Sequence, residues 1–305
     1  MHKVIFSIGM DDLARTIQAN LADASLGVLE TKLFPDGERY HRLPTLEIIG
    51  NHVILVASTH NDAQTLDLFD VACAAVKCGA KQLCLVIPYF GYSTMERAVL
   101  LGEVVKMKTR ARLFSLIPQA PLGNHIFLMD LHTDSQHYFE GDSIPTHVYA
   151  RPLHVNVLQQ IKQLYPTLVV ASTDTGRAKW VESLAAELNT PAATIHKRRT
   201  AEGVSVASVS ADVKGRCVVI FDDMIRSGNS LFQAVETYRT AGAARVFAIA
   251  THALFCGNFL ANFNKSNIEH LYVTNTVPGT ITHQKITYTD VGPLLASAIR
   301  ESTHE

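Results

Sequence analysis

Residues 217–231 read CVVIFDDMIRSGNSL and decide how the rest of the chain is interpreted. Residues 217–221 are apolar and largely β-branched, which predicts a strand buried on both faces. Two adjacent carboxylates, Asp222 and Asp223, follow the strand, and a short polar loop of residues 226–230 leads into a helical pattern that continues to Thr240. A strand, a loop of small residues and a helix start bring backbone N–H groups and the positive end of a helix dipole together, which is typical of a phosphate site.

The two carboxylates suit sugar hydroxyl groups or Mg²⁺, which prefers oxygen ligands. The stretch contains no Gly-Lys-Ser/Thr, so it is not the phosphate loop of the nucleoside triphosphatases. It resembles the phosphoribosyl diphosphate signature of the phosphoribosyltransferase fold, in which Asp-Asp, three residues and Ser/Thr-Gly-x-Ser/Thr follow an apolar strand. The alternative interpretation is an ordinary strand–turn–helix unit with Ser227 or Asn229 as the helix cap.

The composition, with 305 residues of which 47% are apolar and 18% charged, is that of a soluble α/β protein of about two domains. The net charge of −1 argues against binding to nucleic acid or to an anionic membrane. No apolar run is long enough to cross a bilayer, and the N-terminus turns acidic too early for a signal peptide, so we expect a cytoplasmic protein. The five cysteines are scattered, and the 14 histidines form no metal-binding motif.

Strand and helix patterns alternate in both halves of the chain, which predicts a mostly parallel sheet flanked by helices in each half. We place a first domain at residues 1–150 and a second at residues 151–289, and we expect the closing helix within residues 290–305 to pack on the first. The expected strands cover residues 3–8, 27–32, 52–57, 82–87, 125–129, 167–171, 192–196, 217–221, 245–250 and 270–274, and residues 203–209 alternate like one arm of a hairpin.

Polar clusters follow these expected strands at their carboxyl ends, where parallel sheets bind their ligands. We therefore expect a ligand site built from these ends. The clusters are Asp36/Glu38, Asp130/His132, Asp174, Lys197/Arg199 and Asp222/Asp223.

Seven blocks of sequence, in order and almost from end to end, resemble those of the ribose-phosphate diphosphokinases, also called phosphoribosyl diphosphate synthetases. The blocks are FPDGE at residues 34–38, VIPYFGY at 86–92, DLH at 130–132, TDTG at 173–176, KRR at 197–199, FDDMIRSGNSL at 221–231 and ATHALFCGN at 250–258. The resemblance implies two phosphoribosyltransferase-like domains with the active site at their junction, in a homo-oligomer that is a dimer or a hexamer.

The resemblance also implies the reaction and its participants. Such an enzyme of nucleotide biosynthesis transfers the diphosphoryl group of ATP to the C1 hydroxyl of ribose 5-phosphate, with Mg²⁺, and gives phosphoribosyl diphosphate and AMP. The implied roles are catalysis by Lys197 and Arg199; ATP binding by Phe34, Asp36, Glu38, Arg97 and His132; ribose 5-phosphate binding by Asp222, Asp223, Ser227, Gly228, Asn229 and Ser230; and metal binding by His132 and Asp174.

The chain departs from the family pattern at several of these positions. After Phe-Gly-Tyr the family carries Ala-Arg-Gln-Asp-Arg, whereas residues 93–97 read STMER, so the first arginine, which clamps ATP, is replaced by Thr94. One lost charge-assisted contact to phosphate costs about 1.5–3 kcal/mol. Arg226 and Asn229 replace an aspartate and a glycine of the phosphate loop, and Arg177 replaces a glycine and could crowd or reach into the site.

Two other functions stay open. The altered ATP loop favours a catalytically weak or inactive homologue that binds nucleotide or sugar phosphate and regulates a partner. A phosphoribosyltransferase that uses phosphoribosyl diphosphate as donor is compatible with the fold, although the two-domain length and the FPDGE block argue against it.

Overall fold

The computed structural model describes residues 2–200 and 203–302, and the side chains of residues 197–207 lie outside this description. The chain forms two compact units. Unit 1 comprises Met1–Tyr149, Thr276–Pro278 and Asp290–Glu305, and unit 2 comprises Ala150–Asn275 and Gly279–Thr289. Among the described residues, no helix is long and apolar enough to cross a membrane.

Unit 1 is built on a parallel sheet of six strands in the order β2-β1-β5-β6-β7-β8. Every residue of β5, β6 and β7 is buried, as the continuous apolar runs in these segments predict. The strands are β1 (Lys3–Ile8), β2 (Ala24–Leu26), β5 (His52–Ala57), β6 (Gln82–Ile87), β7 (Asn124–Met129) and β8 (Ser143–Val148).

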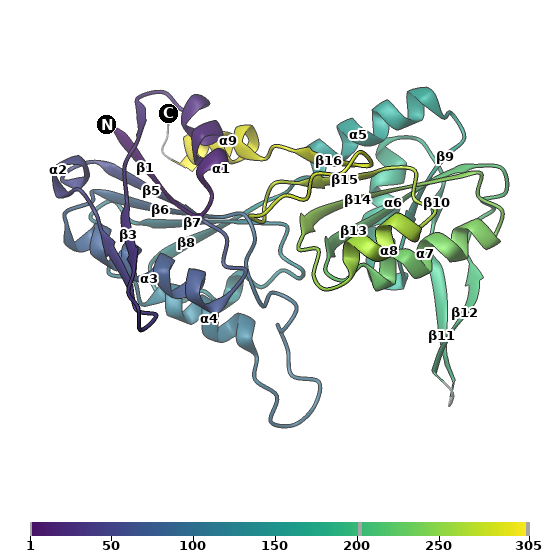
Figure 1. The fold of residues 1–305 in the computed structure, drawn as a ribbon, viewed down its shortest axis with the longest axis horizontal. Helices are drawn as coiled ribbons and strands as arrows, with labels where there is room; N and C mark the ends of the chain where they lie inside the picture. Colours follow the sequence, from purple (N-terminus) through teal and green to yellow (C-terminus); the bar gives the residue numbers. More distant parts are fainter. Residues whose placement is uncertain (1, 201–202, 303–305) are drawn as a thin grey trace. The chain divides into compact units, whose positions relative to one another are not determined.

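Helices cover both faces of the unit 1 sheet (Figure 1), with α1 and α9 drawn above the strands and α3 and α4 below them. The α3 helix begins after Asn61, whose side chain accepts a hydrogen bond from the backbone N–H of Gln64, as a capping asparagine does. The helices are α1 (Asp11–Ala19), α2 (Thr45–Ile48), α3 (Asp62–Lys77), α4 (Lys106–Ser115) and α9 (Gly292–Ser302), with a 3₁₀ turn, η1 (Gln136–Tyr138).

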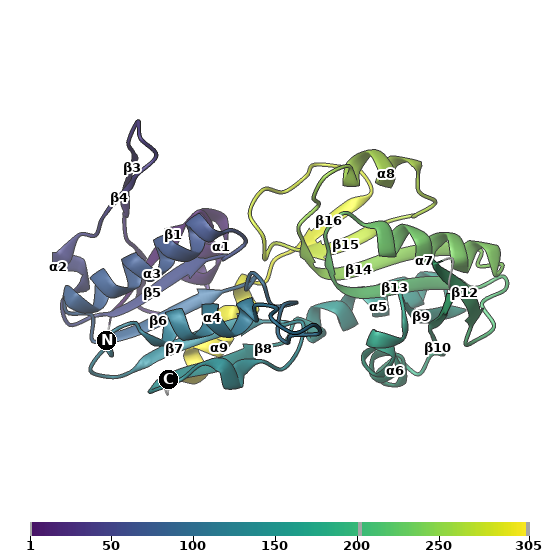
Figure 2. The ribbon, with the colours of Figure 1, turned by 90° about the horizontal axis from the view of Figure 1, so that it is seen from below.

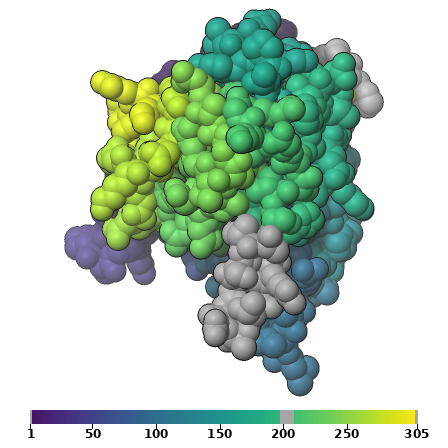
Figure 3. Space-filling view, turned by 90° about the vertical axis from the view of Figure 1, so that its right-hand side faces the viewer, coloured from purple at the N-terminus to yellow at the C-terminus, as the bar shows by residue number. Residues whose placement is uncertain are grey.

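Unit 2 repeats this design with a second parallel sheet of six strands in the order β10-β9-β13-β14-β15-β16. In the space-filling view, the face that this unit presents changes from yellow on one side through green to teal on the other (Figure 3). The strands are β9 (Leu168–Ser172), β10 (Ala192–Ala193), β13 (Cys217–Ile225), β14 (Arg245–Ala253), β15 (Leu271–Thr274) and β16 (Ile286–Thr289).

The central strand β13 divides the core of unit 2 into two layers. Cys217, Val219 and Phe221 pack with the cluster that includes α5 and α6, whereas Val218 and Ile220 pack with the cluster that includes α7 and α8. This alternation is the two-residue period of a strand buried on both faces. The helices are α5 (Arg151–Leu164), α6 (Ala178–Glu187), α7 (Asn229–Thr240) and α8 (Phe259–Lys265), with a 3₁₀ turn, η2 (Thr175–Arg177), before α6. The predicted fold class, two mostly parallel sheets flanked by helices, is confirmed.

Two antiparallel hairpins stand apart from the sheets. The second confirms the hairpin arm predicted for residues 203–209, and both divide a strand that the sequence led us to expect. The expected strand of residues 27–32 is divided between an irregular stretch and β3 (Glu30–Leu33), which pairs with β4 (Arg39–Arg42). Figure 2 shows this hairpin projecting from its sheet. The expected strand of residues 192–196 is likewise divided between β10 and β11 (Ile195–Thr200), which pairs with β12 (Gly203–Val209). The polar clusters at residues 36–38 and 197–199 therefore do not follow sheet strands, because they belong to hairpins.

Gly91 lies at the turn after β6, and it is held against the turn after β5. Its backbone N–H donates to the Thr59 hydroxyl at 2.9 Å. A Cβ atom at this position would lie 2.0 Å from the backbone oxygen of Thr59, so a side chain fits only if the backbone moves. The close approach of the two turns therefore requires glycine.

We predict that Gly91→Ala lowers the free energy of unfolding by about 1–3 kcal/mol, because the methyl group collides with the backbone rather than with a movable side chain. Urea denaturation followed by circular dichroism measures the change. An unchanged midpoint would show that the two turns do not need to approach this closely.

Candidate functional site

The carboxylate pair Asp222 and Asp223 lies within β13, not after it, because the strand continues to Ile225. The neighbouring strand β9 pairs with β13 only as far as Ser172 opposite Phe221, whereas β14 continues beside β13 to its end. Beyond Ser172 the chain turns through residues 173–177. The pair therefore lies at the carboxyl edge of the unit 2 sheet, where ligands of parallel sheets bind.

Asp222 is held by its neighbours on both carboxylate oxygens. One oxygen accepts the Asp223 backbone N–H at 3.0 Å, and the other accepts the Thr173 hydroxyl at 3.2 Å. Burial, and then the negative charge of Asp223, raise the pKa of Asp222 to about 7, although the positive charge of Arg177 acts in the opposite direction. The ionised form of Asp222 is thus less favourable in the folded chain than in the unfolded one. Such raised pKa values are common among carboxyl groups at functional sites.

Asp223 is buried and forms an ion pair with the guanidinium of Arg177. Its side chain is 9% exposed, and that of Arg177 is 21% exposed, so the pair is largely withdrawn from water. Arg177 ends η2 and stands at the start of α6. The arginine that replaces the family glycine therefore reaches into the carboxylate pair, which is one of the two outcomes that the sequence left open.

Asp174, one of the two predicted metal ligands, stabilises the turn that follows it. One carboxylate oxygen accepts the Gly176 backbone N–H at 2.9 Å and so caps η2. His132, the other predicted ligand, belongs to unit 1, whereas Asp174 belongs to unit 2. Within residues 2–200 and 203–302, no three His, Cys, Asp or Glu residues are grouped to hold a metal ion. The oxygen chemistry of Asp174 fits Mg²⁺, but its metal role stays a prediction.

The predicted phosphate loop is shorter than expected, because α7 already begins at Asn229. Gly228 stands at the helix start with a left-handed backbone, φ 79°, and no side chain caps the helix. The alternative with Ser227 or Asn229 as cap is therefore wrong. Because the first backbone N–H groups of a helix have no partner within it, this uncapped start is suited to an anion.

The packing beneath the loop explains why residue 228 is a glycine. A Cβ atom there would lie 2.6 Å from the Phe232 ring and 2.9 Å from the Phe259 ring. The backbone oxygens of Ile225 and Arg226 also accept N–H groups of Leu254 and Cys256, both at 2.9 Å. The loop thus rests on two rings and on the segment after β14, which hold its backbone in place.

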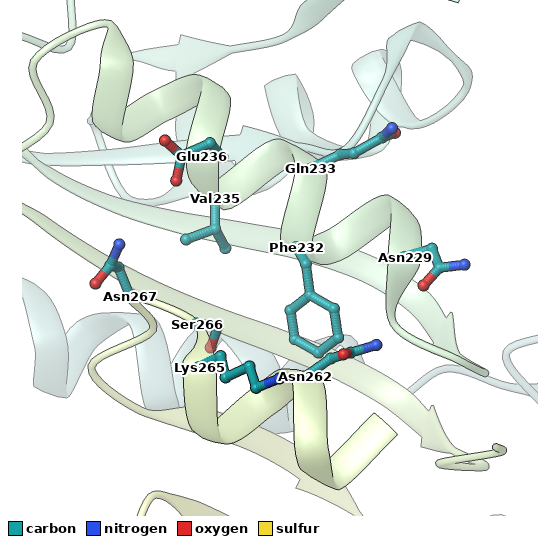
Figure 4. Close-up of a pocket in the computed structure, with 9 residues that line it drawn as sticks. All are labelled: Asn229, Phe232, Gln233, Val235, Glu236, Asn262, Lys265, Ser266 and Asn267. Carbon is teal, nitrogen blue, oxygen red and sulfur yellow. The ribbon is translucent and has the colours of Figure 1, made fainter. Parts of the chain in front are cut away.

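Asn229 has a helical backbone, so its replacement of a family glycine introduces no left-handed strain. Its side chain is exposed at the start of α7 and lines a cavity of about 470 Å³ between α7 and α8 (Figure 4). Figure 4 shows Phe232 pointing from α7 toward Asn262 of α8. Asn229 is the one predicted site residue among those that line this cavity, so the cavity and the carboxyl edge of β13 are different places.

The FPDGE block forms the tip of the β3–β4 hairpin in unit 1. Phe34 is 44% exposed and meets Tyr40 edge-on, with 6.3 Å between ring centroids. The Asp36 carboxylate accepts the Glu38 backbone N–H at 3.0 Å, and the three predicted nucleotide-binding side chains are all exposed. The structure places them together on one hairpin, and their role stays a prediction.

The loop after β6 carries the altered STMER segment. Arg97 is 79% exposed on its side chain and lies 3.6 Å from the Glu96 carboxylate. Tyr92 has a left-handed backbone, φ 63°, and Lys106 lies over its ring with 4.4 Å between ammonium and centroid. Lys106 therefore adds positive charge beside Tyr92, which stands two residues before Thr94 in the altered loop.

The turn that carries His132 is fixed by β8. Asp130 has a left-handed backbone, φ 38°, and its N–H donates to the Val148 oxygen at 3.1 Å. The Leu131 N–H donates to the His147 ring nitrogen Nε2 at 3.1 Å, and burial lowers the pKa of His147. Neutral His147 accepts this hydrogen bond, so it contributes to the geometry of the His132 turn. The sequence pattern did not predict β8 or His147.

Lys197 and Arg199 belong to β11, with Val206 and Val204 as their partners on β12. Their side chains lie outside the described part of the structure. The catalytic role predicted for them therefore stays a prediction.

Comparison with known proteins identifies the family. The model of the N-terminal domain of ribose phosphate pyrophosphokinase matches residues 3–117, and that of the phosphoribosyl synthetase-associated domain matches residues 182–305. A ribose-phosphate pyrophosphokinase of Chromobacterium violaceum is 32% identical over 305 residues, which cover 96% of this chain and 89% of that protein. The chain belongs to the ribose-phosphate pyrophosphokinase family.

Two further relatives agree with this assignment. A ribose-phosphate pyrophosphokinase of Nostoc is 36% identical over 260 residues, covering 83% of this chain and 76% of the relative. The crystal structure of phosphoribosylpyrophosphate synthetase from Mycobacterium smegmatis matches with a TM-score of 0.88 and 25% identity, covering 100% of this chain and 99% of that one. The family predicted from the seven sequence blocks is confirmed.

Three residues that support the candidate site were not predicted as contributors. Thr173 holds Asp222, and Tyr238 holds the end of β9 through a 2.9 Å hydrogen bond to the Ser172 oxygen. Phe259 lies under the phosphate loop. Thr173 stands in the TDTG block, so its position carried a signal, whereas Tyr238 and Phe259 are apolar-face residues of helices.

We predict that Asp222→Asn stabilises the protein in a pH-dependent way. The pKa of Asp222 is raised from 3.8 to about 7, so the unfolded chain ionises this residue at lower pH than the folded chain does. Stability is therefore lost as the pH rises from about 4 to about 7, and the loss is constant above that. Asparagine avoids this loss and keeps an oxygen for the Asp223 N–H.

Between about pH 4 and pH 7, the free energy of unfolding of the variant is expected to rise by about 1–3 kcal/mol relative to that of the wild type. Urea unfolding at several pH values measures this difference. If the free energies of unfolding of wild type and variant differed by the same amount at every pH in this range, the raised pKa of Asp222 would be contradicted.

Proposed function

We propose that the protein is an active ribose-phosphate diphosphokinase, which transfers the diphosphoryl group of ATP to the C1 hydroxyl of ribose 5-phosphate and releases AMP. One observation carries this proposal. In a chain of the ribose-phosphate pyrophosphokinase family, Asp222 and Asp223 of β13 are followed, after a short loop, by the uncapped start of α7. Carboxylates accept hydroxyl groups of a sugar, and backbone N–H groups at a helix start bind its phosphate.

The ribose 5-phosphate half of the site lies in unit 2. Asp222 and Asp223 accept the ribose hydroxyl groups, while Ser227, Gly228, Asn229 and Ser230 hold the 5-phosphate through N–H and hydroxyl groups. Arg226 is exposed beside this loop and adds a positive charge for the phosphate. The left-handed Gly228 supports this assignment, because it lets the loop pack closely on Phe232 and Phe259 and so holds the start of α7 in place.

The nucleotide half lies in unit 1, where Phe34, Asp36, Glu38, Arg97 and His132 bind ATP. Phosphoryl transfer depends on positioning and on positive charge aimed at the phosphate oxygens, and divalent metal ions generally supply part of that charge. We assign Mg²⁺ to His132 and Asp174, where it would neutralise charge on the ATP phosphates. Lys197 and Arg199 stabilise the charge that develops on the transferring group.

The proposal extends to a homo-oligomer, a dimer or a hexamer, and to a cytoplasmic location. It is supported by the nearly full-length match to relatives of this family. Analytical ultracentrifugation of the purified chain measures the assembly state.

Release of AMP from ATP and ribose 5-phosphate, followed by a coupled assay with Mg²⁺, tests the function. We predict turnover by the wild type, and a loss of about 10²–10⁴-fold in Lys197→Ala, because a charge-assisted contact to the transferring group is removed. Turnover of the wild type no higher than that of Lys197→Ala would refute the catalytic function. Binding of ribose 5-phosphate without turnover would instead identify the regulatory homologue that Thr94 favours.

A further inference from the structure

Arg177 brings a fixed positive charge into a carboxylate pair that would otherwise be two adjacent negative groups. Its guanidinium pairs with Asp223, whose backbone N–H in turn donates to Asp222. Both partners of the ion pair are largely buried, so their attraction is weakly screened by solvent. The carboxylate pair therefore has an internal cation before any ligand arrives.

The backbone around Arg177 holds this cation in place. Asp174 caps η2 by accepting the Gly176 N–H, and the Ser172 hydroxyl donates to the Asp174 backbone oxygen at 2.6 Å. Both contacts fix the turn between β9 and α6 from which Arg177 extends. The guanidinium reaches Asp223 from a braced turn, unlike an exposed arginine at the end of a mobile loop.

A divalent cation at the same carboxylates would have to compete with the guanidinium. Mg²⁺ binds through carboxylate oxygens and requires an almost regular octahedron of ligands. One carboxylate here is paired with Arg177, and the other is engaged by Thr173 and by the Asp223 N–H. The hydrogen bonds alone would not exclude a metal ion, but the fixed positive charge of Arg177 on Asp223 disfavours a second cation at this pair.

We infer that Arg177 is the resident cation of the Asp222–Asp223 pair and takes the place of a divalent metal ion there, so that the sugar-phosphate half of the site binds its ligand without metal. This inference rests on the proposed function for the identity of the ligand. The metal assigned to His132 and Asp174 is a separate ion.

Titration of the full-length protein with Mn²⁺ alone, followed by the electron paramagnetic resonance of free Mn²⁺, tests the inference without substrate or turnover. We predict that Arg177→Gln gains a Mn²⁺ site, or strengthens binding about tenfold, because the competing charge is removed. The double variant Arg177→Gln/Asp223→Asn is expected to lose that gain. Arg177→Lys keeps the charge and is expected to behave as the wild type.

Lys179→Gln is the matched control, because Lys179 is an exposed cation two residues along the same segment, and it is expected to leave Mn²⁺ binding unchanged. Equal Mn²⁺ binding by Arg177→Gln and the wild type would overturn the inference. If Arg177→Gln does not fold, the comparison of wild type with Asp223→Asn decides: loss of a Mn²⁺ site in Asp223→Asn would show that metal already binds the pair, whereas equal binding supports Arg177 as its cation.

Calorimetry with ribose 5-phosphate in EDTA and in Mg²⁺ separates this inference from the proposed function. We predict wild-type affinities within about twofold of each other, and an Arg177→Gln affinity that Mg²⁺ raises about tenfold. A tenfold effect of Mg²⁺ on the wild type would overturn the inference. Absence of ribose 5-phosphate binding under both conditions would refute the proposed function, while the Mn²⁺ titration would still decide the role of Arg177.

Discussion

The placement of two adjacent carboxylates in the last part of β13, Asp223 buried and Asp222 half-buried, is the constraint on which the rest of unit 2 depends. Burial of one carboxylate beside another is unfavourable, and the chain offsets it with a hydroxyl, a backbone N–H and a guanidinium. Each of these groups comes from β13 itself or from the turn after β9. The site therefore depends on β9 and β13 being neighbours in the sheet. The uncapped start of α7 at Asn229 follows β13 after residues 226–228 and supplies the complementary environment for an anion.

The phosphate loop shows how packing at a distance from the ligand fixes a backbone. Phe232 and Phe259 leave no space for a side chain at Gly228, and the segment after β14 binds the two carbonyl oxygens before it. Arg226 and Asn229, which depart from the family pattern, are exposed residues and do not belong to the packed side chains beneath the loop. The loop backbone can therefore keep its form while the charges around it change.

Sequence reasoning succeeded where a single physical signal dominated. The apolar runs of β5, β6, β7 and β13 predicted buried parallel strands, and the seven sequence blocks predicted the family. It failed where tertiary pairing decides: residues 30–33 and 195–200 form hairpins, because an antiparallel partner follows each of them closely. The Arg177–Asp223 pair could not be assigned from sequence, since an arginine at a turn can equally face solvent. Its contact depends on how η2 directs the side chain.

The central claim is that the carboxylate pair and the phosphate loop together form a site for a phosphorylated sugar. The most direct measurement compares ribose 5-phosphate with ribose by isothermal titration calorimetry of the purified protein. The account predicts that ribose 5-phosphate binds at least about a hundredfold more tightly, since several charge-assisted contacts to phosphate are worth about 1.5–3 kcal/mol each. Equal affinity for the two sugars, or no binding of ribose 5-phosphate, would contradict it.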